Sequence, residues 1–459
     1  MTTRLGERIL DRAAGSRPIP GNAVSLLVDG TEAYPAMLDV IARAERWIHF
    51  ENYIIRDDHT GRRFGEALAE RARAGVRVRV LYDALGSFGT GFGYWRALRR
   101  AGVEVRAFHP IFSGHPFDIF VRDHRKLLVA DGGRAMVGGI CIGDEWAGDP
   151  ERGREPWRDT MVTVCGPAAA ALDASFASVW GRAGPPLDPS ALTPDPESCG
   201  DCDVRVVIGV PFEGRTYRAT QLIAAAAHER LWITDAYLAP PAPLYAALLD
   251  AARAGVDVRI LVPGVSDLPV MRNLTRTGYR ELLRAGVHVF EWLGPMIHAK
   301  TLVADRQWAR VGSSNLNVSS LLGNYELDLL TDNVAMADAL AAQFRRDLQS
   351  SREIVLDPRR RILPPRLVRA AAEPIDPNAP PPKRRKRSGY ELGAVAVVAV
   401  RRVAGGLRRA IARTAALVSL LTAVLLIAFP RVMSIALAAG MFWLALGFGV
   451  YAFGKQRAR

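Results

Sequence analysis

The chain has 459 residues, of which 49% are hydrophobic and 23% charged, and it contains four Cys. This length suits two to three domains. The composition excludes a disordered chain, and so few Cys exclude a disulfide-based scaffold. The net charge of +13 resides entirely in residues 383–459, while residues 1–382 hold 46 basic and 46 acidic residues. Nucleic-acid binders spread basic residues over a folded face, so no nucleic-acid partner is expected.

The N-terminal residues 1–21 contain no long apolar core, so they show no signal-peptide pattern. Without an export signal, we expect the thiols to be reduced. Cys199 and Cys202 have C-x-x-C spacing, but they lie among Pro-rich stretches and lack a second ligand pair. Neither a zinc site nor a redox motif is therefore expected there.

An internal repeat organises residues 22–357. The runs that begin at Ala44 and His228 each read as an apolar strand, a loop, an amphipathic helix ending at Ala-Gly-Val, and a second β-rich run. Both then continue alike, from Arg96 and from Arg280. Helices that follow strands predict an α/β fold with a largely parallel sheet. Two copies predict two similar lobes related by a pseudo-twofold axis.

Shifts in composition set the expected boundaries of the segments, because Pro-rich and charged stretches favour linkers. The predicted segments are an N-terminal segment (1–21), a first lobe (22–182), a linker (183–203), a second lobe (204–357), a Pro-rich basic linker (358–390) and a membrane-anchoring tail (391–459).

The residues that can carry chemistry recur at the same place in both copies. Each copy contains His-x-Lys, then four residues, then Asp, and next a turn of small residues. These residues are His124, Lys126 and Asp131 in the first copy and His298, Lys300 and Asp305 in the second. Residues two apart in a strand share a face, so each His and Lys would point the same way. One such pattern can arise by chance, whereas two at matched positions of a repeat indicate a site.

This residue set suits phosphodiester chemistry. An imidazole can attack phosphorus or transfer a proton near neutral pH, and a Lys ammonium neutralises phosphate oxygens. Two His from two lobes could flank one phosphate, one as nucleophile and the other as the group that protonates the leaving oxygen and later activates the acceptor. Because lysines and amide donors would supply the electrophilic stabilisation, neither a metal nor another cofactor is expected.

With these motifs, residues 22–357 resemble the phospholipase D superfamily with two HKD motifs, specifically the cardiolipin synthases. The supporting strings are FENYIIRDD, RDHRK, GGICIGDEW, WRDT, GSSNLN and NYELDL. The resemblance implies a phosphohistidine intermediate and transfer of a phosphatidyl group between two phosphatidylglycerol molecules, giving cardiolipin and glycerol. A phospholipase D that uses water as acceptor and a lipid-binding protein with a degenerate site remain alternatives. A nuclease is less expected because residues 1–382 are neutral.

The resemblance also implies roles for residues beyond the histidines. An acid would orient each imidazole, with Asp159 matching the first motif and Glu326 the second. Phosphate contacts would come from the two motif lysines together with Ser313 and Asn315. Cys141 stands where the family commonly has Asn, and we expect it to be a small packing residue rather than a nucleophile.

The motif aspartates and two matching strand ends are further candidates for the site. Asp131 and Asp305 complete the catalytic motif, and we expect them to serve the turn and local packing. The strand ends 51–53 and 235–237 occupy matching places and could line the cleft, or they could be ordinary strand ends.

The tail predicts a helical membrane hairpin. Residues 432–454 carry no charge over 23 positions, and residues 414–429 carry none over 16. The longer run suffices to span a bilayer, while a re-entrant partner for it remains open. Both flanks are basic, so the positive-inside rule places the lobes on the cytoplasmic side of the cell membrane. A bilayer with anionic lipid is the expected partner.

Overall fold

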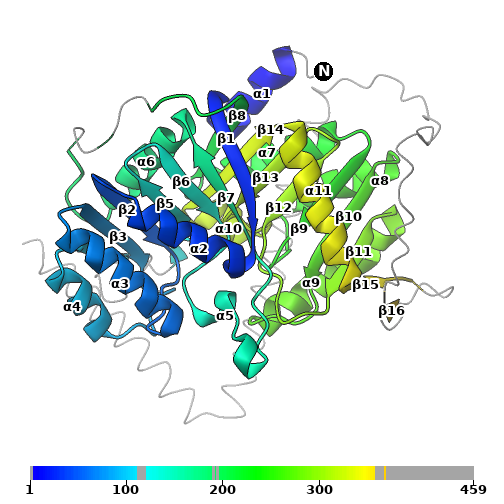
Figure 1. The fold of residues 1–459 in the computed structure, drawn as a ribbon. Coiled ribbons are helices and arrows are strands. Elements are labelled where there is room, and N and C mark those ends of the chain that lie inside the picture. The colour runs from blue at the N-terminus through cyan, green and yellow to red at the C-terminus, as the bar shows by residue number, and fades with distance from the viewer. Residues whose placement is uncertain (1–3, 111–119, 189–191, 193–195, 357–365, 368–459) are drawn as a thin grey trace, which may run out of the picture. The chain divides into compact units, whose positions relative to one another are not determined.

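The computed structural model describes residues 4–110, 120–188, 192, 196–356 and 366–367, and these include both predicted lobes (Figure 1). The predicted tail lies outside the described residues. Within the described part, no helix has both the length and the apolar composition needed to cross a membrane.

The first lobe alternates strands and helices before it ends in antiparallel strands and a helix. Its elements, with the preceding helix α1 (Arg4–Ala14), are β1 (Ile19–Val28), α2 (Asp29–Ala42), β2 (Trp47–Asn52), α3 (His59–Arg73), β3 (Arg77–Asp83), α4 (Phe92–Arg100), β4 (Glu104–Phe108), β5 (Lys126–Ala130), β6 (Arg134–Gly138), α5 (Asp144–Ala147), a 3-10 turn (Pro150–Arg152), β7 (Thr160–Cys165) and α6 (Pro167–Trp180).

The second lobe repeats this order. Its elements are β8 (Cys202–Gly209), α7 (Arg215–Ala226), β9 (Arg230–Thr234), α8 (Ala242–Arg253), β10 (Asp257–Pro263), α9 (Pro269–Ala285), β11 (His288–Trp292), β12 (Thr301–Ala304), β13 (Trp308–Gly312), α10 (Val318–Gly323), β14 (Glu326–Asp332) and α11 (Val334–Gln349), followed by β15 (Ser351–Ile354) and β16 (Arg366–Leu367).

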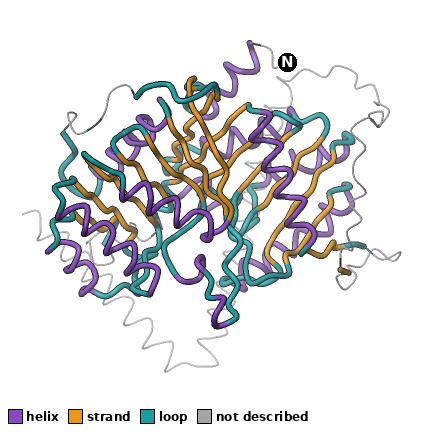
Figure 2. The backbone as a smooth tube through the Cα atoms, viewed as in Figure 1, coloured by secondary structure: helices purple, strands orange, loops and turns teal. Residues whose placement is uncertain are grey.

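The two lobes share one strand order, which confirms the predicted repeat. The first lobe runs β4-β3-β2-β5-β6-β7-β1, and the second runs β11-β10-β9-β12-β13-β14-β8. Strands β1 and β8 pair antiparallel and join the lobes (Figures 1 and 2).

The prediction of a largely parallel sheet is only partly right. Strands β2, β3 and β4 are parallel, as are β9, β10 and β11, but the remaining ladders are antiparallel. The reason lies in the connections. The turns 131–133 and 305–307 join β5 to β6 and β12 to β13, and connections that short permit only antiparallel pairing.

The lobes share a hydrophobic core. Strand β5 is buried on both faces, and its alternate residues pack in different directions. Leu128 packs with α2 and α3, whereas Val129 belongs to a cluster that also contains Phe176 of α6, Val311 of β13 and Phe344 of α11. Because this cluster contains residues of both lobes, its packing fixes the position of one lobe against the other. Side chains from both lobes can therefore form one site.

The structure differs from the expectation that all thiols are reduced. Cys165, the last residue of β7, forms a disulfide with Cys199 in the segment that connects the lobes. The two Cys of the C-x-x-C spacing are therefore not paired with each other. Cys141 and Cys202 are free and buried.

Candidate active site

The sheet topology carries both histidines to the carboxyl edge of the parallel strands. Strand β5 runs antiparallel to β2, so Lys126 at its start lies opposite Asn52 at the end of β2. In the second lobe, Thr301 at the start of β12 likewise lies opposite Thr234 at the end of β9. Ligand sites of open α/β sheets form at this edge. His124 and His298 precede these strand starts by two and three residues.

Each imidazole is bound by a carboxylate from the other lobe. The His124 Nδ1 lies 3.0 Å from Glu326 Oε2, and the His298 Nδ1 lies 2.7 Å from Asp159 Oδ2. The pairing that the resemblance implied, Asp159 with the first motif and Glu326 with the second, is therefore wrong.

Backbone contacts between the lobes explain the crossing. The His124 N–H donates to the Tyr325 carbonyl at 3.0 Å, and the His298 N–H donates to the Arg158 carbonyl at 2.7 Å. Each histidine thus lies beside the residue that immediately precedes the other lobe's acid. Motif spacing contains no information about such a contact.

The two acids are held by different donors. Glu326 accepts hydrogen bonds from the hydroxyls of Ser313 and Ser320, each at 2.5 Å. Asp159 accepts from the Trp146 indole at 2.9 Å and from the Thr160 N–H at 2.8 Å. The resemblance implied a phosphate contact for Ser313, whereas its hydroxyl is directed to the orienting acid.

The pKa values of these groups favour a neutral imidazole beside an ionised acid. Burial lowers the pKa of His124, and burial followed by the nearby Lys300 charge lowers the pKa of His298 to about 4. Burial alone would raise the pKa of Asp159, but His298 and Lys300 lower it to about 2. The pKa of Glu326 is lowered for like reasons. A carboxylate at Nδ1 favours the tautomer whose lone pair is on Nε2, the atom that can attack or take a proton.

The motif lysines are buried beside the imidazoles. Each ammonium donates to the backbone carbonyl of its own histidine, Lys126 to His124 and Lys300 to His298. Burial, together with the charge of Lys126, lowers the pKa of Lys300 to about 8, although Asp159 opposes this shift. Two ammonium groups from two lobes therefore face one region, which suits the oxygens of a single phosphate.

Aromatic rings border the imidazoles, and Tyr53 and Tyr237 have matching roles. The Tyr53 ring lies 4.8 Å from the His124 ring, and the Tyr237 ring lies 5.9 Å from the His298 ring, between centroids. The strand ends 51–53 and 235–237 therefore do contribute to the site.

The His298 side has two further rings that sequence reasoning missed. Trp146 and Trp157 lie 5.6 and 5.9 Å from the His298 ring. Their only signal was their place in the strings GGICIGDEW and WRDT, near the acid.

Asn315 and Cys141 occupy equivalent positions, as the repeat predicted. Asn315 is buried, and its Oδ1 has no hydrogen-bond partner among the described residues. Cys141 is also buried, and burial raises the pKa of its thiol, so the thiolate is disfavoured. This supports packing rather than nucleophilic chemistry for Cys141.

The motif aspartates lie at the far ends of their strands, away from the imidazoles. The Asp131 carboxylate accepts from the backbone N–H groups of residues 45–47, and the Asp305 carboxylate from those of residues 228–230. Both have a positive φ, 54° and 52°, which a tight turn requires. Their contacts are those of turn and packing residues.

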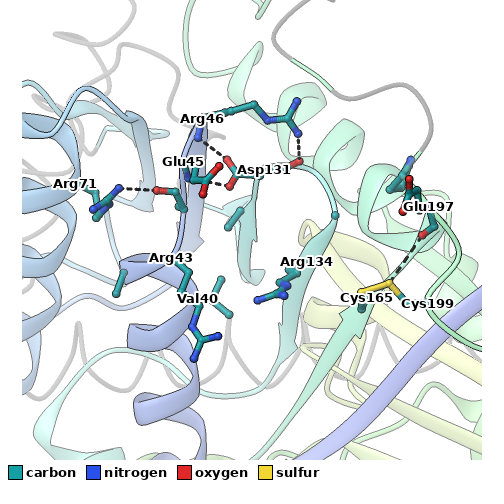
Figure 3. Close-up of a pocket in the computed structure, with 15 residues that line it drawn as sticks. Val40, Arg43, Glu45, Arg46, Arg71, Asp131, Arg134, Cys165, Glu197 and Cys199 are labelled. Atoms are coloured by element: carbon teal, nitrogen blue, oxygen red, sulfur yellow. Dashed lines mark hydrogen bonds between the residues drawn. A yellow bond between two sulfur atoms is a disulfide. The ribbon is translucent and has the colours of Figure 1, made fainter.

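A cavity of about 740 Å³ also lies at this far end, so it is separate from the imidazoles (Figure 3). Asp131, Arg134 and the Cys165–Cys199 disulfide line it, together with Arg43 and Arg71.

The sequence of this chain is similar to those of known proteins. The family described as "Cardiolipin synthase, PLD-like domain" matches residues 37–147 and 220–348. Cardiolipin synthase A of Pseudomonas aeruginosa is 36% identical over 361 residues, covering 78% of this chain and 73% of the relative. Cardiolipin synthase of Halalkalibacterium halodurans is 33% identical over 357 residues, covering 76% of this chain and 70% of the relative.

Solved structures share the fold. Phosphatidylserine synthase of Haemophilus influenzae superimposes with a TM-score of 0.60 at 13% identity, covering 78% of this chain and 92% of that one. Polyphosphate kinase of Porphyromonas gingivalis superimposes with a TM-score of 0.52 at 12% sequence identity. The match covers 74% of this chain and 49% of that one. The twofold family match and the extent of the identity to curated relatives place this chain in the cardiolipin synthase family of phosphatidyltransferases, within the phospholipase D superfamily.

Proposed function

We propose that the protein makes cardiolipin from two phosphatidylglycerol molecules through a phosphohistidine intermediate and releases glycerol. The observation that carries this proposal is the pair of crossed His–carboxylate contacts with two buried ammonium groups beside them. That arrangement supplies two equivalent Nε2 atoms around one phosphate and neutralises its charge.

In the first half-reaction, Nε2 of one imidazole attacks the phosphorus of phosphatidylglycerol. A P–N bond forms, and the P–O bond to the glycerol head group breaks. The second imidazole donates a proton to the departing oxygen. It acquires that proton as the anionic phosphodiester binds, because a nearby negative charge raises the pKa of an imidazole.

In the second half-reaction, a hydroxyl of another phosphatidylglycerol attacks the phosphohistidine. The second imidazole takes the hydroxyl proton, the P–N bond breaks, and the first imidazole is regenerated. Lys126, Lys300 and the amide of Asn315 stabilise the charge on the phosphoryl oxygens in both steps. The sum is two phosphatidylglycerol giving one cardiolipin and one glycerol.

The test is incubation of the purified protein with phosphatidylglycerol, followed by lipid analysis with and without added glycerol. Cardiolipin and glycerol in equal amounts, with reversal by added glycerol, are the expected result. Phosphatidic acid as main product would show that water is the acceptor, and no turnover with any phospholipid would show a binding protein.

We propose that the protein acts at a membrane, with its lobes on the cytoplasmic side. The basic flanks of the predicted hairpin support this side. The Cys165–Cys199 disulfide argues for the other side, because disulfides persist in oxidising compartments. Thiol alkylation in intact cells decides between them. Cytoplasmic lobes would yield reduced, alkylated Cys165 and Cys199, whereas an intact disulfide would place the lobes outside.

A further inference from the structure

We propose that the catalytic lobes dock directly onto the bilayer through an apolar rim made of Leu85, Phe88 and Phe92 in the first lobe and Val265, Leu268 and Val270 in the second. The inference rests on the proposed function in one respect, namely that the substrate is a phospholipid. It assigns membrane contact to residues that the two lobes carry themselves, apart from the predicted tail.

The rim side chains are unusually exposed for their type. Phe88, Phe92 and Val270 expose 71%, 88% and 80% of their surface, and the other three are also exposed. A group of exposed large apolar side chains marks an interaction surface, whereas single ones need no explanation.

The two halves of the rim occupy equivalent places in the repeat. Strands β3 and β10 end at Asp83 and Pro263, and each is the central strand of its parallel trio. Leu85 and Val265 are both second after these strand ends, and Phe88 and Leu268 are both fifth. Apolar exposure at the same positions in both lobes places an equivalent patch on each lobe, as pseudo-twofold symmetry requires.

In the first lobe, the rim loop is tied to the tyrosine beside the catalytic histidine. The Ser87 hydroxyl, next to Phe88, donates to the Tyr53 carbonyl at 3.2 Å and accepts from the Ile55 N–H at 3.0 Å. At Gly86 a Cβ would lie only 2.3 Å from that same Tyr53 carbonyl, so the loop passes directly over Tyr53.

In the second lobe, the corresponding tie runs through a side chain. The Tyr237 hydroxyl donates to Asp267 Oδ1 at 2.8 Å, and Asp267 immediately precedes Leu268. Tyr53 and Tyr237 are the rings that border His124 and His298. The rim loops therefore lie beside the tyrosines of both half-sites.

A bilayer is the occupant that fits these observations. The imidazoles are buried, and the phosphodiester of a membrane lipid lies at the level of the head groups, so the lobes must approach the bilayer closely for the two to meet. The exposed aromatic and aliphatic side chains of the rim can enter the head-group layer. Residues 84–95 carry no charge, and the one acid of residues 264–271, Asp267, is bonded to Tyr237.

The first experiment compares two substrates of the full-length protein. Phe88→Ser with Phe92→Ser, and separately Val265→Ser with Val270→Ser, should lower kcat/KM on phosphatidylglycerol vesicles by about tenfold or more, because apolar burial is lost. Turnover of short-chain phosphatidylglycerol below its micellar concentration should not change. Equal losses on both substrates, or no loss on vesicles, would overturn the proposal.

The matched control is Ile9→Ser. Ile9 is an exposed apolar residue on α1, which lies at the opposite end of the described structure from α5 and α9 in Figure 1. Its replacement should leave turnover on both substrates unchanged. Thermal unfolding of all variants checks that they fold as the parent does.

A second experiment is independent of turnover. A fluorophore on Phe92→Cys should be quenched by nitroxide-labelled acyl chains in vesicles more strongly than one on Ile9→Cys. Cys141 and Cys202 are buried, and Cys165 and Cys199 stay in their disulfide when reductant is omitted, so the new Cys is selectively labelled. Equal quenching at both positions overturns the docking. Shielding from aqueous iodide without lipid quenching overturns it too, because the chain's own tail or a second copy would then cover the rim. Lipid quenching without turnover would instead refute only the proposed function.

Discussion

At the scale of single residues, the site depends on two imidazoles that each need the other lobe. His124 and His298 are both buried, and each contacts one acid. Because the two imidazoles are proposed to act on one phosphate, removal of either histidine leaves the other without its counterpart. The two groups should then behave as one unit.

His124→Ala and His298→Ala should therefore each remove nearly all transferase activity, and the double variant should be no worse than the poorer single one. The measurement is the initial rate of cardiolipin formation. The control is His288→Ala, because His288 is a half-exposed histidine that also pairs with a carboxylate, Glu353. Substantial activity in either catalytic variant would contradict a shared site.

The pH dependence should follow Lys300 on the alkaline side. Its pKa of about 8 means that the ammonium is present below that pH and is lost above it. We expect kcat/KM, which reports the free enzyme, to fall first as the proton-donating imidazole becomes neutral, and to fall again as pH rises through about 8 and Lys300 loses its proton. The acid limb should lie well below the usual histidine range, because the pKa of His298 is about 4.

Lys300→Arg provides the comparison, because a guanidinium stays protonated throughout this range. Its activity should be lower, since its shape differs, but the fall near pH 8 should disappear while the fall at lower pH remains. An unchanged alkaline limb in this variant would assign that limb to another group.

At the scale of elements, the two lobes differ in the side chains that are buried next to the turns following β6 and β13. The second lobe buries a polar group in which Asp328 accepts from Ser314 and from Thr216 and pairs with Arg310 at 3.4 Å, and three of its members belong to the strands and turn. Gly138 is paired with Met161 in the first lobe as Gly312 is paired with Asp328 in the second. Counted from these two glycines, the equivalent positions of the first lobe hold apolar residues. Those residues are Met161, Ile140 and Met136.

This difference predicts a stability pattern. Asp328→Ala leaves the buried Arg310 charge unpaired and should lower the free energy of unfolding by roughly 3–5 kcal/mol. The combined change Arg310→Met, Ser314→Ile and Asp328→Met should cost less than the single change, because no charge remains buried. Urea unfolding measures both, and a triple variant less stable than the single one would contradict the argument.

The same variant separates stability from positioning. Ser314 lies between Ser313, which holds Glu326, and Asn315. If Arg310, Ser314 and Asp328 hold the turn that contains Ser313 and Asn315, the triple variant should fold well and yet lose activity.

At the scale of the whole molecule, both lobes share one core and hold every residue assigned to chemistry. A chain that stops after residue 390 should therefore fold, be more soluble, and keep activity on detergent-dispersed lipid. On bilayers its activity should be much lower, because the predicted anchor is gone. The binding that remains through Lys383 to Arg387 should fall with salt, while binding through the apolar rim should not.

Vesicle sedimentation at low and high salt tests this prediction. Full-strength activity on bilayers without residues 391–459 would show that the tail is dispensable for access to substrate. A truncated protein that cannot unfold cooperatively would show that the lobes need the tail.

The sequence by itself determined the repeat, the two His-x-Lys motifs and the acids near them, because these are encoded locally. A strand pattern places His and Lys two apart, and a duplicated pattern is visible without any structure. The resemblance of several short strings then sufficed to place the chain in its family. The two tyrosines were visible as matched strand ends, although their contact with the imidazoles was not.

Only the tertiary structure decided which acid serves which histidine, that the sheets are mixed, and that Cys165 pairs with Cys199. Each of these depends on contacts between segments far apart in the chain. Spacing along the sequence specifies which face a side chain takes, but not which distant strand lies beside it. The crossed pairs arise because short backbone contacts at Tyr325 and Arg158 hold each histidine against the opposite lobe.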